Sequence, residues 1–171
     1  STTLEINAEN KVTTGQEKVV TLDFTVNVNY TEISATSLLY KSGVYMSHIE
    51  AIKGCNYADE LGLVLKSAKN GDNATITLPQ ISGYIIDDIY FYNSKAGDSN
   101  TYAELYNIHK NDPCKFRNIK DKEYTTKLQG KKSPIEDIVG TENDSQYYLK
   151  ITFGSNTSLG ISSMEITYQR M

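Results

Sequence analysis

The stretch N-A-T-I-T-L-P-Q-I-S-G-Y-I-I-D-D-I-Y-F-Y, residues 73–92, determines the fold that the sequence predicts. Side chains of a β-strand alternate between two faces, so the alanine, isoleucine and leucine of residues 74–78 share one face of a first strand. Pro79 cannot donate to a strand ladder, and Gly83 marks a turn. Alternation resumes after Gly83. We therefore expect two strands joined by a turn, as in a hairpin.

The second of these strands has a counterpart near the end of the chain. Residues 86–91, I-D-D-I-Y-F, have apolar side chains at their first, fourth and sixth positions, and residues 161–166, I-S-S-M-E-I, repeat this spacing. An offset of three breaks strict alternation, so we expect one extra residue, a β-bulge, before each strand settles. Both stretches are predicted to be core strands of one sandwich.

The rest of the chain contains further short alternating stretches separated by turn residues. We expect strands within residues 18–26, 37–52, 57–66, 102–108, 147–153 and 161–168. Residues 107–140 are the least regular, and there we expect loops around a short strand at residues 124–128. Many short strands, with no credible helix beyond a couple of turns, predict an all-β sandwich or barrel. The length suits a single domain, residues 1–171.

The charge of the chain argues against two classes of partner. It has 17 basic and 21 acidic residues, for a formal net charge of -4. Nucleic-acid-binding modules usually have a clear basic excess, and anionic membranes attract basic segments. No run of about 18 apolar residues exists, so we expect no membrane span. No signal peptide is visible, and we expect an extracellular or surface protein whose export signal or lipid anchor has been removed.

Tyrosine dominates the aromatic side chains, with 13 tyrosines, four phenylalanines and no tryptophan. Most tyrosines are expected to pack within strands. If Ile89 and Phe91 point inward, however, Tyr90, Tyr92 and Asp88 line the opposite face of that strand. Phenol rings beside a carboxylate can stack on a sugar and bind its hydroxyls. These three are candidate ligand-binding residues; the alternative is that a sheet, a loop or a partner domain covers them.

A second candidate location is the loop-rich region that begins near residue 102. Tyr102, Tyr106, His109 and Arg117 belong to it, and loops on a rigid scaffold often carry function. We take Tyr102, Tyr106 and Arg117 as further candidate ligand-binding residues.

The sequence carries no recognisable catalytic set. Asp87 and Asp88 are adjacent, and adjacent strand residues face opposite sides, so we do not expect them to form the facing pair of a glycoside hydrolase. His48 lies outside any metal-ligand spacing. Cys55 and Cys114 match no zinc or redox motif. They form one disulfide or remain separate thiols, and we favour thiols because free cysteine is usually buried.

Four stretches resemble jelly-roll modules with the galactose-binding-like fold, which recur in secreted and surface proteins of polysaccharide-using anaerobic bacteria. They are residues 63–79, ending in T-I-T-L-P; residues 81–92, with I-D-D-I-Y-F; residues 148–153, Y-L-K-I-T-F; and residues 161–168, I-S-S-M-E-I-T-Y. The resemblance implies a β-sandwich in which members often bind glycans. Fold alone does not settle function.

Sandwiches of the resembled type often hold one structural calcium ion, and hard oxygen ligands are abundant in this chain. Asp72 and Glu165 are the candidate calcium ligands. The alternative is that both carboxylates are simply solvated.

Three hypotheses about function follow. The first is a non-catalytic carbohydrate-binding or adhesion module that contacts a glycan or surface polysaccharide. The second is a structural or protein-interaction domain beside other domains of a larger protein. The third is a lyase or hydrolase on a jelly roll, which requires convergence of two carboxylates, or of tyrosine, histidine and arginine, in one groove.

Overall fold

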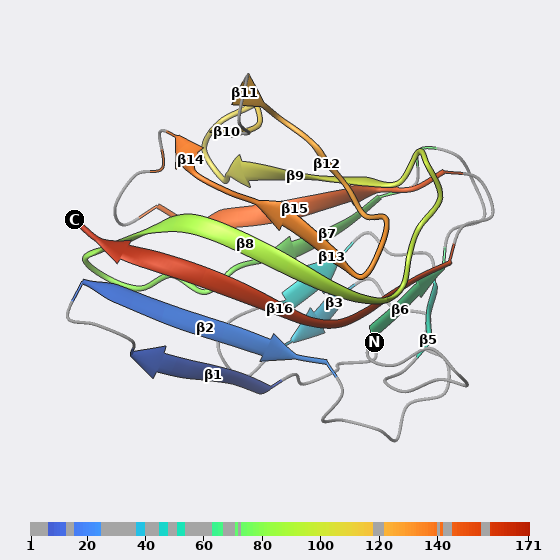
Figure 1. The fold of residues 1–171 in the computed structure, drawn as a ribbon, viewed down its shortest axis with the longest axis horizontal. Coiled ribbons are helices and arrows are strands. Elements are labelled where there is room, and N and C mark those ends of the chain that lie inside the picture. Colours follow the sequence, from blue (N-terminus) through green and yellow to red (C-terminus); the bar gives the residue numbers. More distant parts are fainter. Residues whose placement is uncertain are drawn as a thin grey trace.

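The protein is built from antiparallel β-sheets, as the sequence predicts (Figure 1). The computed structural model describes residues 7–12, 16–24, 37–39, 45–47, 51–53, 63–66, 71, 73–117, 122–139, 141, 145–154 and 158–171. Within these residues there is no helix, and hence none that could cross a membrane.

The first sheet is organised around the last strand of the chain. It contains β1 (Asn7–Val12), β2 (Glu17–Asp23), β5 (Ala51–Lys53), β6 (Leu63–Lys66), β8 (Tyr84–Lys95), β13 (Lys132–Ile135) and β16 (Ser158–Arg170). One edge of β16 pairs with β8, and its other edge pairs with β2 over residues 163–169 and with β6 over residues 158–161. In Figure 1, β2, β16 and β8 lie side by side.

The second sheet packs against the first. Its strand order is β12 (Thr126–Lys127), β9 (Tyr102–Asn107), β15 (Tyr147–Thr152), β7 (Asn73–Thr77), β4 (Tyr45–Ser47) and β3 (Ser37–Leu39). A small third sheet joins β11 (Lys122–Glu123), β10 (Lys115–Arg117) and β14 (Ile138–Val139). The region 107–140 therefore contains more paired strand than the single short strand that the sequence indicates.

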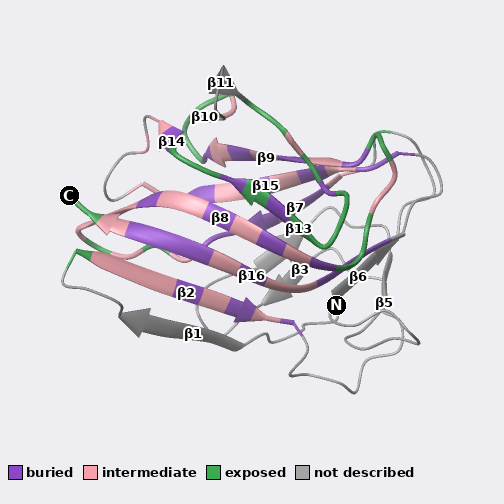
Figure 2. Cartoon of the chain, viewed as in Figure 1, coloured by how far each residue is buried: buried purple, intermediate pink, exposed green. Residues whose placement is uncertain are grey.

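One hydrophobic core lies between the two large sheets. Inward side chains of β2, β8 and β16 meet those of β7, β9 and β15, and they include Leu22, Phe91, Met164, Ile76, Leu105 and Leu149. Figure 2 shows the resulting alternation of buried and half-buried residues along β8 and β16. The predicted all-β sandwich is confirmed, whereas the finer assignment to the galactose-binding-like fold stays a prediction.

The predicted hairpin over residues 73–92 is wrong. β7 pairs with β15 and β4 in the second sheet, while β8 pairs with β16 and β13 in the first. The connection after β7 therefore crosses from one sheet to the other. Each strand is amphipathic as expected, but alternation within a strand does not specify which neighbour it pairs with.

The crossover is held by hydrogen bonds from both sheets. The Leu78 amide donates to the Tyr147 carbonyl of β15 at 2.9 Å. The Tyr168 hydroxyl of β16 donates to the Pro79 carbonyl at 2.6 Å. Gly83, at φ 83°, turns the chain into β8 with a conformation that most side chains disfavour.

Both predicted bulges exist, and they are two of the three register irregularities in the pairing of β8 with β16; the third leaves out Ser94, near the end of β8. Thr167 lies opposite Asp88 and Tyr168 opposite Ile86, which leaves Asp87 as the extra residue. Ile86 and Ile89 are both buried, so Asp87 and Asp88 both lie on the outer side of β8. The expectation that these two carboxylates face opposite sides is therefore wrong, because a bulge interrupts alternation.

The second bulge is at Ser162, between Ile161 and Ser163 of β16. The Ser162 hydroxyl donates to the Tyr92 carbonyl at 3.0 Å, and the Phe24 amide donates to the Ser162 carbonyl at 3.0 Å. The polar groups displaced from the regular ladder thus have partners, as buried backbone groups require.

Cys114 is half-buried and packs against the hydrophobic core. The preference for separate thiols stays a prediction. Cys55 and His48 lie outside the described residues.

We expect deletion of Asp87 to be tolerated, because it removes the extra residue and leaves Ile86, Asp88 and Ile89 in regular alternation. A loss of about 1–3 kcal/mol in the free energy of unfolding is expected. Deletion of Tyr90 instead turns one half of β8 onto the wrong face, and cooperative unfolding should be lost. Urea denaturation followed by circular dichroism compares the two proteins, and equal damage by both deletions would contradict the assigned bulge.

Candidate functional site

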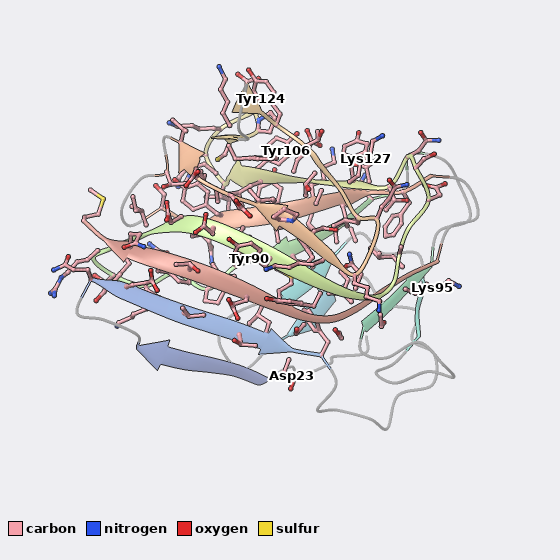
Figure 3. All side chains as sticks on the ribbon, viewed as in Figure 1. Asp23, Tyr90, Lys95, Tyr106, Tyr124 and Lys127 are labelled. Carbon is pink, nitrogen blue, oxygen red and sulfur yellow. The ribbon has the colours of Figure 1, made fainter. Side chains whose placement is uncertain are left out.

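The predicted ligand residues lie on opposite outer faces of the sandwich. Asp88, Tyr90 and Tyr92 are outward residues of β8 in the first sheet, and Tyr102 and Tyr106 are outward residues of β9 in the second. Figure 3 shows Tyr90 on β8 and Tyr106 on β9. The structure therefore does not bring these residues into one site, because the hydrophobic core separates them.

On the first sheet, a lysine lies over both candidate tyrosine rings. Lys132 of β13 is opposite Tyr92 in register. Its ammonium nitrogen lies 4.3 Å from the ring centroid of Tyr90 and 5.7 Å from that of Tyr92. Such cation–π contacts use the ring face on which a sugar would stack. A ligand on this face would have to displace Lys132.

Acidic groups surround Tyr90. Burial, with the charges of Asp88 and Glu136 and a hydrogen bond with Glu136, raises the pKa of the Tyr90 phenol to about 12. Glu165 of β16 is opposite Tyr90 in register, so this predicted calcium ligand belongs to the same outer face.

The bulge at Asp87 creates a cluster of three carboxylates. Oxygen atoms of Asp87, Asp88 and Asp137 lie within 4.8 Å of one another. The Asp137 amide, at φ 53°, donates to Asp88 Oδ1 at 2.9 Å. Sequence reasoning missed this cluster because regular alternation separates Asp87 from Asp88, and only the offset of three residues in the apolar pattern pointed to the bulge.

The pKa of Asp87 and that of Asp88 are shifted in the same direction. Burial is the largest cause of the increase in both pKa values. For Asp87, repulsion from the charges of Asp88 and Asp137 raises the pKa further. For Asp88 the hydrogen bond from the Asp137 amide partly opposes the increase in pKa.

The calcium prediction stays a prediction. Asp72 lies outside the described residues. Glu165 lies between Tyr90 and Thr21 of the neighbouring strands. The three-carboxylate cluster has the hard oxygen donors that calcium prefers.

The outer surface of the second sheet, here called the β9 face, combines tyrosines with polar side chains. It consists of the outward residues of β7, β9, β12 and β15: Asn73, Thr75, Tyr102, Glu104, Tyr106, Lys127, Tyr148, Lys150 and Thr152. Strand pairing arranges them in three rows. Tyr102 lies between Thr152 and Lys127, Glu104 is opposite Lys150, and Tyr106 is opposite Tyr148.

The last of these rows is a tyrosine pair. The rings of Tyr106 and Tyr148 are stacked, with centroids 5.4 Å apart and planes at 11°. The Tyr106 hydroxyl donates to Glu104 Oε2 at 3.2 Å. Burial and the charge of Glu104 raise the pKa of Tyr106 to about 12. Tyr148 was identified from the sequence only as a strand residue, because its partner depends on register.

An open cavity of about 560 Å³ lies at the Tyr102 end of the β9 face. It is lined by Gly71, Ser99, Asn100, Tyr102, Thr125, Lys127, Thr152 and Phe153. Its six polar side chains make no hydrogen bond to one another or elsewhere in the part of the chain that the structure describes. Hydroxyl, amide, phenol and ammonium groups therefore converge on one open hollow without protein partners among the described residues.

The rim of this cavity is built on a tightly bonded turn. Asp98 Oδ1 accepts from the Thr101 hydroxyl at 2.8 Å and from the Asn100 amide at 3.0 Å. Buried Thr101 Oγ1 accepts from the Gly154 amide at 3.3 Å. A Cβ atom at Gly154 would overlap the Asp98 carboxylate, so glycine allows this close approach. Ser99 and Asn100 are thus positioned before any ligand arrives.

The loop-borne site predicted around Arg117 is not assembled by the described residues. Tyr102 and Tyr106 are strand residues, as their alternation also indicated, and His109 follows β9 as an exposed residue. Arg117 is in β10 of the third sheet, and its side chain lies outside the described residues. A second open cavity of about 460 Å³ lies beside Asn107, the last residue of β9. It is lined by Asn107, Lys110, Asn111, Asp112, Pro113, Cys114, Lys115 and Val139.

Comparison with known proteins adds little to this geometry. No family model matches the chain, and no curated protein matches it. Among solved structures the chain is similar to a low-affinity xylan-binding module, CBM86, from the xylanolytic gut symbiont Roseburia intestinalis. The two share 14% identity with a TM-score of 0.42, over 92% of this chain and 97% of that one. A likeness at this TM-score carries no argument about ligand or site.

Replacing Asp87 with Asn should raise the thermal midpoint at pH 7 and leave it unchanged at pH 3. A raised folded-state pKa means that folding favours the protonated carboxyl. This contribution to stability is present below the unfolded-state pKa of about 3.9 and is lost as the pH rises through the folded-state pKa.

Thermal unfolding of both proteins at the two pH values, in the presence of a chelator, measures this difference. A midpoint at pH 7 that is lower for Asp87→Asn than for the unaltered protein would contradict it. A rise in the midpoint of the unaltered protein on adding calcium would identify the carboxylate cluster as a cation site if Asp87→Asn abolished that rise.

Proposed function

We propose that this protein is a non-catalytic carbohydrate-binding module whose ligand lies on the β9 face. The observation that carries the proposal is the cavity beside Tyr102, where six polar side chains have no hydrogen-bond partner among the described residues. Carbohydrates present many hydroxyl groups around an apolar ring surface. A pocket for such a ligand combines an aromatic side chain with a few convergent polar groups.

The length of the β9 face suits an oligosaccharide rather than a single sugar. Tyr102 and Tyr106 are four residues apart on one strand, which corresponds to about 14 Å at a rise of about 3.4 Å per residue. Glu104 and Lys150 lie between them and can bond sugar hydroxyls as acceptor and donor. A chain that starts in the cavity can therefore continue toward the tyrosine pair.

The opposite face of the sandwich is the less favourable location. Tyr90 and Tyr92 already hold the Lys132 ammonium against their rings. Asp88, Tyr90 and Tyr92 do not line either of the two cavities described above. These residues remain candidates from the sequence, but binding there would replace an existing cation–π contact.

Binding without catalysis fits the composition of the β9 face, in which Glu104 is the one acidic residue among those named above. A glycan-binding module of this kind would act outside the cell or at its surface, beside other domains, with a soluble glycan or surface polysaccharide as its partner.

Tyr102→Ala should weaken binding by about tenfold or more, because buried aromatic anchors commonly contribute over 1 kcal/mol to an interface. A glycan array followed by isothermal titration calorimetry with the best ligand gives the affinities. Tyr124→Ala is the matched control, since Tyr124 is 42% exposed and lies outside both faces.

A double variant, Tyr90→Ala with Tyr92→Ala, should keep its affinity. If this variant loses binding while Tyr102→Ala does not, the site is on the first sheet. If the folded protein binds no glycan on the array or at millimolar ligand, the proposed function is wrong.

A further inference from the structure

We propose that the glycan bound on the β9 face carries an anionic substituent, a uronate carboxylate or a sulfate ester, and that Lys127 recognises it. This inference rests on the proposed function and specifies the ligand class. Its basis is the charge of the cavity, which contains one cation and no carboxylate among its lining residues.

Lys127 has no counterion among the residues that the structure describes. It is exposed, and it makes no ion pair, hydrogen bond or ring contact with any described residue. Lys127 is opposite Tyr102 in register, so its side chain is in the same row as the ring that would carry the sugar. An anionic group held there would receive a charge-assisted hydrogen bond, which is stronger than one between neutral groups.

A second lysine lies along the same path. Lys150 is the outward residue of β15 next to Thr152 and is opposite Glu104. The Glu104 carboxylate accepts the Tyr106 hydroxyl, and no ion pair between Glu104 and Lys150 is among the described contacts. The cavity itself thus has one ammonium group, that of Lys127, and the next row of the face has Lys150 opposite Glu104, whose carboxylate accepts from the tyrosine pair.

The local charge is opposite to that of the whole chain. The protein has a formal net charge of -4, and the outer face of the first sheet holds the Asp87, Asp88 and Asp137 cluster. A net negative protein repels anionic polymers in general, so a locally cationic cavity is the place where such a ligand can bind. Charge complementarity of this kind contributes mainly to specificity.

The test begins with an array that includes neutral, uronate-containing and sulfated oligosaccharides. The best uronate ligand is then compared with its methyl-esterified form, which keeps the sugar skeleton and removes the charge. We expect about tenfold weaker binding of the ester, in keeping with loss of one charged hydrogen bond. Raising the ionic strength should reduce the difference.

Lys127→Met should remove the preference for the charged form while retaining binding of the neutral form. Lys131→Met is the matched control, because Lys131 is exposed at the turn before β13, away from the β9 face. The control should keep the full preference, and so should Tyr124→Ala. A preference for sulfated over uronate ligands that also depends on Lys127 would assign the sulfate ester as the anionic group.

Several results would overturn the inference in distinguishable ways. If neutral glycans bind as tightly as charged ones and this binding is lost in Tyr102→Ala, the ligand is neutral and the proposed function stands. If glycans bind but Tyr102→Ala has no effect, the site is not on the β9 face, and if no glycan of any class binds, the proposed function fails as well. A charge preference that persists in Lys127→Met places the recognition elsewhere and rejects the role of Lys127.

Discussion

The pairing of β8 with β16 is the contact on which the rest of the sandwich depends. β16 connects every part of the first sheet, since β8 occupies one of its edges and β2 and β6 share the other. Ile89, Phe91, Met164 and Ile166 of the two strands are fully buried against the second sheet. Irregularities at Asp87 and Ser94 of β8 and at Ser162 of β16 let two irregular apolar patterns pair along their whole length.

The crossover from β7 to β8 decides which tyrosines share a surface. Because the chain changes sheets between these strands, Tyr90 and Tyr92 are placed on one side of the core and Tyr102, Tyr106 and Tyr148 on the other. The Tyr168 hydroxyl ties the crossover to β16, and burial raises the pKa of that phenol. The same amphipathic strands joined as a hairpin would have placed all of these rings differently.

The two outer faces differ in whether their polar groups are already engaged. On the first sheet, Lys132 covers two rings and Asp88 accepts a backbone amide. At the cavity of the β9 face, the ring of Tyr102 and its polar neighbours have no partner within the described residues. Since the Asp98 turn fixes the rim through Thr101, a ligand would meet groups that are already ordered, which lowers the entropic cost of binding.

The sequence by itself determined the strand class, the inward positions and the existence of both bulges, because these depend on alternation within a single strand. It also identified Tyr102, Tyr106 and the outward tyrosines of β8. Only the tertiary structure decided strand pairing. An amphipathic strand can pair at both of its edges, and the alternation of its side chains does not specify which strand pairs at either edge. The Asp87 and Asp88 cluster, the Tyr106–Tyr148 pair and the cavity at Lys127 all arise from that pairing, which joins residues distant in the chain.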